Sequence, residues 1–226
     1  MNIQNLINPL LLLEIKEDML VLSETENEEK GTPTLQEVII TSLPKGLIAY
    51  STDTYLKDLG DKKRKLYNEY MNVPSPLLTK FNGTDRAWID ESEFAETKYI
   101  DKRSDGIIIC RNKNNVSVVI CDLKSTKFKP QDCVDKFMID KLFLDYLISI
   151  LNTVFKQNIN ISIIRYIIFY LKSGLNNKSK PRTTKEDLQK FEKVEQIDFK
   201  EDVFKYPFFK THKNEIKWEK LMSLRE

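Results

Sequence analysis

The chain has 226 residues, of which 41% are hydrophobic and 31% charged, and its formal net charge is +2. This composition is typical of a water-soluble globular protein with a proper core, and the sequence contains no internal repeat, low-complexity segment, Walker loop or dinucleotide fingerprint. The apolar stretches near the start are too short to span a bilayer and follow no basic n-region, so we expect neither a membrane-spanning segment nor a secretory signal.

Two helices are predicted before residue 75. Asn8 is a suitable N-cap and Pro9 suits the first helical position, which predicts a helix over 8–21. A second helix is predicted over 55–72, and it carries the basic run 61–65. This run is interpreted either as a solvated helix face or as a contact for a phosphate backbone.

The sequence between these helices is acidic at 24–30 and mixes strand and turn signals over 34–48. An acidic surface is unfavourable for nucleic acid. The N-terminal region is therefore interpreted as a solvated loop and a packing helix, and the alternatives are a support layer, a partner surface or a shield over a basic cleft.

Two β-branched, apolar runs at 104–110 and 116–124 are the strongest signal in the chain. Neither has helical periodicity, and the turn residues 112–115 lie between them, so the pair predicts a β-hairpin. We expect a four-residue turn that closes with Arg111 opposite Val116.

This register gathers three charged side chains. Asp105 falls opposite Asp122, where Cβ atoms are roughly 4.5–5.5 Å apart, and Lys124 projects from the same face as Asp122. Ionised groups among apolar residues are costly unless they are paired or bind a metal. Carboxylates at strand ends are often solvated turn caps. The long apolar runs, the matching depth of the two acids and the interruption of a buried run by Asp122 favour a site here.

A long helix and a buried strand follow the hairpin. Pro130 suits the first helical position, and an apolar stripe over 134–155 predicts a helix packed on the sheet, with Lys136 and Lys141 off or at the edge of the stripe. Residues 159–171 are β-branched and aromatic and predict a strand parallel to the second hairpin strand. This order predicts the α/β class.

The C-terminal part is basic and aromatic. Residues 172–185 contain no acidic residue, and their composition predicts either a flexible loop suited to phosphates or a linker. Aromatic side chains in the tail are interpreted mainly as core, with base stacking as the alternative. These residues are Phe204, Tyr206, Phe208, Phe209 and Trp218.

The three cysteines, an odd number, indicate a reducing compartment, for which we expect a cytoplasmic location. Cys110, Cys121 and Cys133 lack Cys-x-x-Cys spacing, and the one histidine, His212, is remote in sequence. We therefore expect buried structural cysteines rather than metal ligands.

Asp105, the hairpin, Asp122-x-Lys124, the long helix and the strand after it resemble the PD-(D/E)xK nuclease superfamily. The resemblance extends over residues 100–171 and implies a restriction-endonuclease-like fold, in which a mixed central sheet is flanked by helices. Ser104 stands where the name of the motif has proline, a position that varies widely in the superfamily.

The resemblance implies that Asp105 and Asp122 are ligands of Mg²⁺ or Mn²⁺ and that Lys124 orients or activates the attacking water. Mg²⁺ prefers carboxylate oxygens and retains several waters, and a bound cation can stabilise charge on a phosphate. A helix before the hairpin often adds a glutamate ligand in this superfamily. The candidates are Glu69, Glu91 and Glu93.

The sequence thus predicts a metal-dependent endonuclease that hydrolyses nucleic acid, with DNA preferred over RNA. Because the superfamily is rich in restriction and anti-phage enzymes, the resemblance also implies a role in defence. One alternative is an RNA endonuclease of the cap-snatching type, although many of those use an upstream histidine as a ligand. The other is a non-catalytic nucleic-acid-binding or assembly module with a nuclease-like fold.

Three regions are predicted: a helical and acidic region over 1–75 packed on the core, a nuclease core over 76–175, and a basic loop with an aromatic and basic extension over 176–226. No membrane partner is expected, and a homodimer and a partner subunit both stay open. The residues expected to bind nucleic acid are Lys127, Lys129, Lys178, Lys180 and Arg182.

Overall fold

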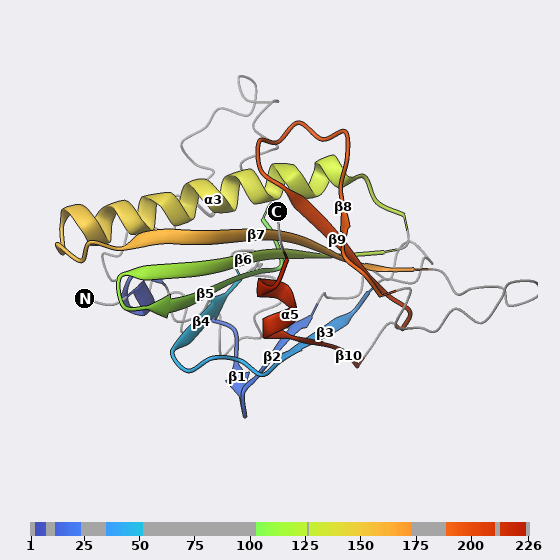
Figure 1. The fold of residues 1–226 in the computed structure, drawn as a ribbon, viewed down its shortest axis with the longest axis horizontal. Helices are drawn as coiled ribbons and strands as arrows, with labels where there is room; N and C mark the ends of the chain where they lie inside the picture. The colour runs from blue at the N-terminus through green and yellow to red at the C-terminus, as the bar shows by residue number, and fades with distance from the viewer. Residues whose placement is uncertain are drawn as a thin grey trace, which may run out of the picture.

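The computed structural model of the chain describes residues 3–7, 12–23, 35–51, 103–125, 127–172, 189–210 and 213–224. These residues form two mixed β-sheets and few helices (Figure 1). The six-stranded sheet contains, in spatial order, β4 (Leu47–Tyr50), β5 (Gly106–Asn112), β6 (Asn115–Lys124), β7 (Asn160–Leu171), β9 (Val203–Phe208) and β8 (Glu192–Lys193). The four-stranded sheet contains β1 (Ile15–Lys16), β2 (Met19–Ser23), β3 (Glu37–Thr41) and β10 (Asn214–Lys217). The helices are η1 (Ile3–Asn5), α3 (Pro130–Thr153) and α5 (Trp218–Met222).

The centre of the larger sheet follows the predicted order of elements. β5 pairs antiparallel with β6, α3 crosses over one face of the sheet, and β7 returns parallel to β6. Pro130 begins α3, and β7 coincides almost completely with the predicted strand. The predicted hairpin, helix and parallel strand are therefore confirmed, and the protein belongs to the general α/β class.

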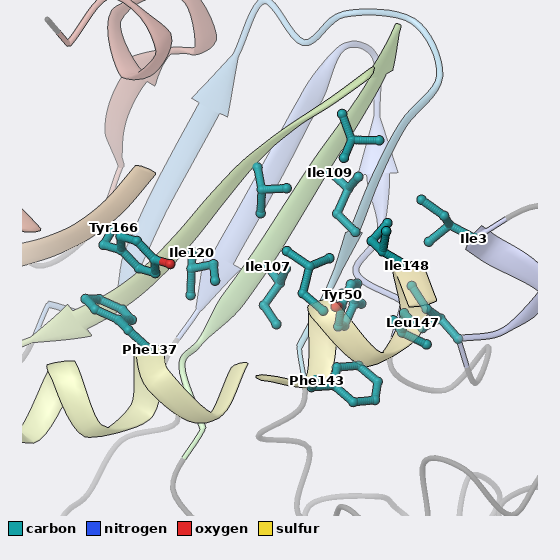
Figure 2. Close-up of a cluster of buried hydrophobic side chains, with 14 of the residues drawn as sticks. Ile3, Tyr50, Ile107, Ile109, Ile120, Phe137, Phe143, Leu147, Ile148 and Tyr166 are labelled. Carbon is teal, nitrogen blue, oxygen red and sulfur yellow. The ribbon is translucent and has the colours of Figure 1, made fainter. Parts of the chain in front are cut away.

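α3 covers one face of the six-stranded sheet (Figure 1). Its apolar stripe packs on side chains that point from β5, β6 and β7 toward the helix. Figure 2 shows part of this core, with Phe137 beside Tyr166 and with Tyr50 beside Phe143. The predicted core role is confirmed for most of the stripe, but it is wrong for Met138 and Leu142, which are exposed.

The four-stranded sheet and α5 cover the opposite face. Successive residues of a strand point to opposite faces, so Ile107 and Ile120 meet α3 whereas Ile108 and Val119 pack against the four-stranded sheet. This double burial explains why both hairpin strands are apolar without alternation. In the part of the chain that the structure describes, the expected flanking helix is thus present on one face, and a second sheet with a short helix takes its place on the other.

Of the five C-terminal aromatic residues predicted as core, Tyr206, Phe208 and Trp218 belong to this second core. Tyr206 lies against Phe169, Phe191 and Phe208, and Trp218 is buried in the same cluster. Their burial accounts for the aromatic density of the tail.

The predicted helix over 8–21 is wrong for its described part. Residues 12–21 contain β1 and most of β2, and the two strands are joined at Glu17 and Asp18. Both residues have positive φ, 46° and 61°, which no helix accommodates. The predicted helix over 55–72 lies outside the described residues. No helix in the described ranges is long and apolar enough to cross a membrane.

Candidate metal centre

The hairpin has the predicted register. The ladder extends from Gly106 opposite Cys121 to Asn112 opposite Asn115, and it includes Arg111 opposite Val116. The turn itself is shorter than expected, because only two residues separate the paired strands and one of them, Lys113, has a positive φ of 55°.

Asp105 and Asp122 therefore lie one step beyond the last ladder pair. Asp105 directly precedes β5, and Asp122 lies near the end of β6. The Asp105 carboxylate accepts a hydrogen bond from the Leu123 backbone N–H, with an N···O distance of 2.5 Å. This bond ties the first acid to the strand that carries the second.

Asp122 is fully buried and is held by two lysines. Lys124 Nζ lies 2.6 Å from Oδ2 of Asp122, and Lys136 Nζ lies 3.0 Å from Oδ1. The two lysine side chains are 19% and 18% exposed, so their ion pairs with Asp122 are largely shielded from water. The structure thus brings together Asp105, Asp122 and Lys124, the three residues predicted from the motif.

Lys136 is the site residue that sequence reasoning missed. It lies in the second turn of α3, and the pattern placed it off or at the edge of the apolar stripe without assigning it a role. The available signal was a lysine almost one turn after Cys133 and next to Phe137, both of which are buried. A lysine at the edge of a buried face can extend its stem along that face and bring its ammonium to a carboxylate.

The two carboxyl groups have opposite electrostatic environments. Burial and then the negative charge of Asp122 raise the pKa of Asp105 well above its ordinary value, and the two lysines compensate only in part. Burial also opposes ionisation of Asp122, but Lys124 and Lys136 outweigh it and lower the pKa of this carboxyl. Of the two carboxyl groups, Asp105 therefore binds a proton more tightly than Asp122, as expected for adjoining carboxylates.

Two features bear on the expected divalent cation: two carboxyl groups adjoin, and both oxygens of Asp122 already lie beside a lysine ammonium. Adjoining carboxylates offer the hard oxygen ligands that Mg²⁺ and Mn²⁺ prefer, and a cation would offset the negative charge of Asp122, which together with burial raises the pKa of Asp105. Among the described residues, no group of three or more His, Cys, Asp or Glu side chains is placed to hold a metal ion. A cation bound to Asp105 and Asp122 would therefore need water or a phosphate oxygen to complete its coordination by these residues. The candidate ligands Glu69, Glu91 and Glu93 lie outside the described residues.

The three cysteines pack in or against the two hydrophobic cores. Cys121 and Cys133 are buried, and burial raises the pKa of both thiols, with the charge of Asp122 acting in the same direction. Cys110 is partly buried, and burial raises its pKa as well. Burial of the cysteines is thus confirmed at two of the three positions, and all three are free thiols.

Two of the residues expected to bind nucleic acid lie beside the site. Lys127 and Lys129 are exposed on the connection between β6 and α3, directly after Lys124. The other three, Lys178, Lys180 and Arg182, lie outside the described residues.

We compared the chain with protein-family models, with curated proteins and with solved structures, and none of them matches it.

Proposed function

We propose that the protein is a metal-dependent nuclease that hydrolyses phosphodiester bonds of nucleic acid, with DNA preferred over RNA. The observation that carries this proposal is the packing of Asp105 against Asp122 beside two partly buried lysines. Burying two carboxyl groups and two ammonium groups in one cluster costs stability. Such clusters of titratable groups with shifted pKa values are typical of functional sites.

The order of elements supports the same proposal. β5, β6, α3 and β7 supply the hairpin, crossover helix and parallel strand that resemble the core of the PD-(D/E)xK superfamily. The chain differs from that superfamily on the other face of the six-stranded sheet, which the four-stranded sheet covers where the resemblance implies a flanking helix.

Each residue has a defined role in the proposed reaction. Asp105 and Asp122 would hold Mg²⁺ or Mn²⁺, which when bound stabilises negative charge on the phosphate and lowers the pKa of a coordinated water. Lys124 keeps its ammonium within hydrogen-bond distance of Asp122 and orients the attacking water. Lys136 holds the other oxygen of Asp122 and adds a second positive charge.

The exposed lysines supply the proposed contact with the nucleic acid backbone. Lys127 and Lys129 precede the first turn of α3, where backbone N–H groups also favour phosphate. A defence role against phage follows by association with the superfamily and belongs to the same proposal, as does a cytoplasmic location.

Cleavage of labelled double-stranded DNA, single-stranded DNA and RNA in the presence of Mn²⁺ tests the proposal. We expect the wild type to cut DNA, and Lys124→Ala and Asp105→Ala to lose cleavage by about 10²-fold or more. Lys141→Ala is the matched control, because Lys141 lies on α3 but pairs with Asp145 instead of the acid pair. Cleavage of RNA alone would favour the cap-snatching type, and no cleavage by folded wild type would contradict the proposal.

A non-catalytic nucleic-acid-binding or assembly module is the second candidate. It is favoured by the fact that Asp122 already has two ammonium partners without any metal. The two candidates differ in metal linkage: a metal-binding site requires Mn²⁺ to raise the melting temperature of the wild type and not that of Asp122→Ala. Equal responses of the two proteins would favour the module.

A further inference from the structure

A third buried carboxylate lies on α3, next to the segment that enters β5. Asp140 is fully buried, and its Oδ2 accepts the backbone N–H of Ser104 at 2.8 Å and a short hydrogen bond from the Ser104 hydroxyl. Ser104 is also fully buried, and it directly precedes Asp105. The two residues are 36 positions apart in sequence, so this contact joins the helix to the strand entrance.

Asp140 and Lys136 contact the two strand ends from consecutive turns of the same helix. Residues four apart on a helix lie on one face, one turn from each other. Lys136 binds Asp122 on β6, and Asp140 binds the residue before Asp105. α3 therefore contacts both strand ends that carry the candidate metal ligands.

We propose that Asp140 is a positioning residue which, through Ser104, holds Asp105 against Asp122. The inference rests on the proposed function, because Asp105 is taken there as a metal ligand. Asp140 itself is assigned no contact with a metal or a substrate.

The surroundings of Asp140 favour a strong restraint. Tyr50 lies close enough for the charge of Asp140 to add to burial in raising the pKa of the tyrosine, and Tyr50 packs edge-on against Phe143. Figure 2 shows Tyr50 and Phe143 among the buried apolar side chains that pack between the sheet and α3. In these buried surroundings, separating the Asp140 carboxylate from the Ser104 N–H and O–H donors would cost free energy. The contact therefore restrains Ser104.

The pair also gives a physical reason for serine at this position. Ser104 uses both its N–H and its O–H, whereas proline, the residue in the name of the motif, has neither donor. Replacing Ser104 by proline would remove the whole contact while leaving Asp140 buried.

Hydrogen exchange of the Leu123 amide tests the inference without any metal. This amide donates to Asp105, so its protection reports whether Asp105 is in place. We expect Asp140→Ala to accelerate its exchange by about tenfold or more relative to Val118 in the same strand. Asp140→Asn, whose side-chain oxygen can still accept from Ser104, should stay within about threefold of the wild type.

The control for general loss of stability is Leu151→Ala. Leu151 is fully buried in the same core, and it lies three turns beyond Asp140 on α3. It should accelerate Leu123 and Val118 alike. The inference is overturned if Asp140→Ala accelerates Leu123 relative to Val118 no more than Leu151→Ala does, or if this ratio is the same in Asp140→Asn as in Asp140→Ala.

Calorimetric titration of the same variants with Mn²⁺ separates the inference from the proposed function. We expect Asp140→Ala to weaken Mn²⁺ binding by about tenfold or more, with Asp140→Asn and Leu151→Ala close to the wild type. Wild-type binding that survives Asp122→Ala would contradict the metal site while the exchange result still supports the positioning of Asp105. Unchanged binding by Asp140→Ala, with binding abolished in Asp122→Ala, would overturn the inference alone.

Discussion

Lys136 of α3 and Asp122 of β6 form a largely buried ion pair with an N···O distance of 3.0 Å. The other oxygen of Asp122 lies 2.6 Å from Lys124 of its own strand. One carboxylate therefore has two cationic partners, one from the strand and one from the helix. The pair fixes the helix on the sheet at the point where the candidate metal ligands meet.

Removing the charge of Lys136 is expected to destabilise the fold. Lys136→Met keeps most of the apolar stem but removes one charged donor from Asp122, and we expect a loss of about 1–3 kcal/mol at neutral pH. Lys141→Met is the control on the same helix, because its i,i+4 pair with the exposed Asp145 contributes only about 0.5 kcal/mol. Urea unfolding of the two variants measures both values. Equal losses would contradict a special role for Lys136.

The raised pKa of Asp105 predicts a pH dependence of stability in the absence of metal. Below the unfolded-state pKa both states hold the proton, and above it the unfolded state ionises while the folded state, with its raised pKa, does not. Wild-type stability should therefore fall with rising pH by up to about 1.4 kcal/mol per pH unit until the folded pKa is reached. Asp105→Asn cannot ionise and escapes this loss.

Urea unfolding with a chelator at pH 4, 6 and 8 checks this expectation. The stability of Asp105→Asn relative to the wild type should increase from pH 4 to pH 8. Asp122, whose folded pKa is lowered, contributes stability above its unfolded pKa, and it does so in both proteins. A difference that is constant or decreases with pH would show that Asp105 is ionised in the folded protein.

The hairpin and the acid pair were predictable because strand periodicity is local. Two β-branched runs and a short turn determine which residues oppose each other, so the register placed Asp105 beside Asp122 even though the turn is shorter than expected. Lys136 and Asp140 were not predicted as partners of this site. Helical periodicity gives the face on which they lie, but not which turn of α3 passes which residue of the sheet.

The N-terminal error has a different cause. Residues 12–21 are apolar at positions compatible with either a helix or short strands, and the capping signals at Asn8 and Pro9 favoured a helix. The strands form because Leu20 and Leu22 pack into the second core and β2 pairs with β3, which are long-range contacts that a local pattern does not contain.

Metal binding should depend on pH, because a cation competes with a proton for Asp105, whose pKa is raised. We expect the rise in melting temperature caused by a fixed Mn²⁺ concentration to be larger at pH 8 than at pH 6. Differential scanning fluorimetry on the wild type and on Asp105→Asn makes the comparison. The variant should respond weakly at both pH values, and a wild-type response that does not change with pH would contradict the proposed proton exchange.

Gly106 links the site strand to the four-stranded sheet. A Cβ atom at this position would lie 2.7 Å from Leu22 Cδ2 of β2 and 3.4 Å from Cys121 Sγ. Because Leu22 is buried and has little room to move, we expect Gly106→Ala to destabilise the protein by about 1–3 kcal/mol.

A double-mutant cycle with Leu22→Val isolates the cause of that loss. Valine has no Cδ atom, so the obstruction is removed and Gly106→Ala should then cost no more than about 0.5 kcal/mol. Leu22→Val alone should cost about 1 kcal/mol through the lost methylene. Urea unfolding of the four proteins gives the coupling energy. If the two losses simply add, the close approach of β2 is not what requires glycine directly after Asp105.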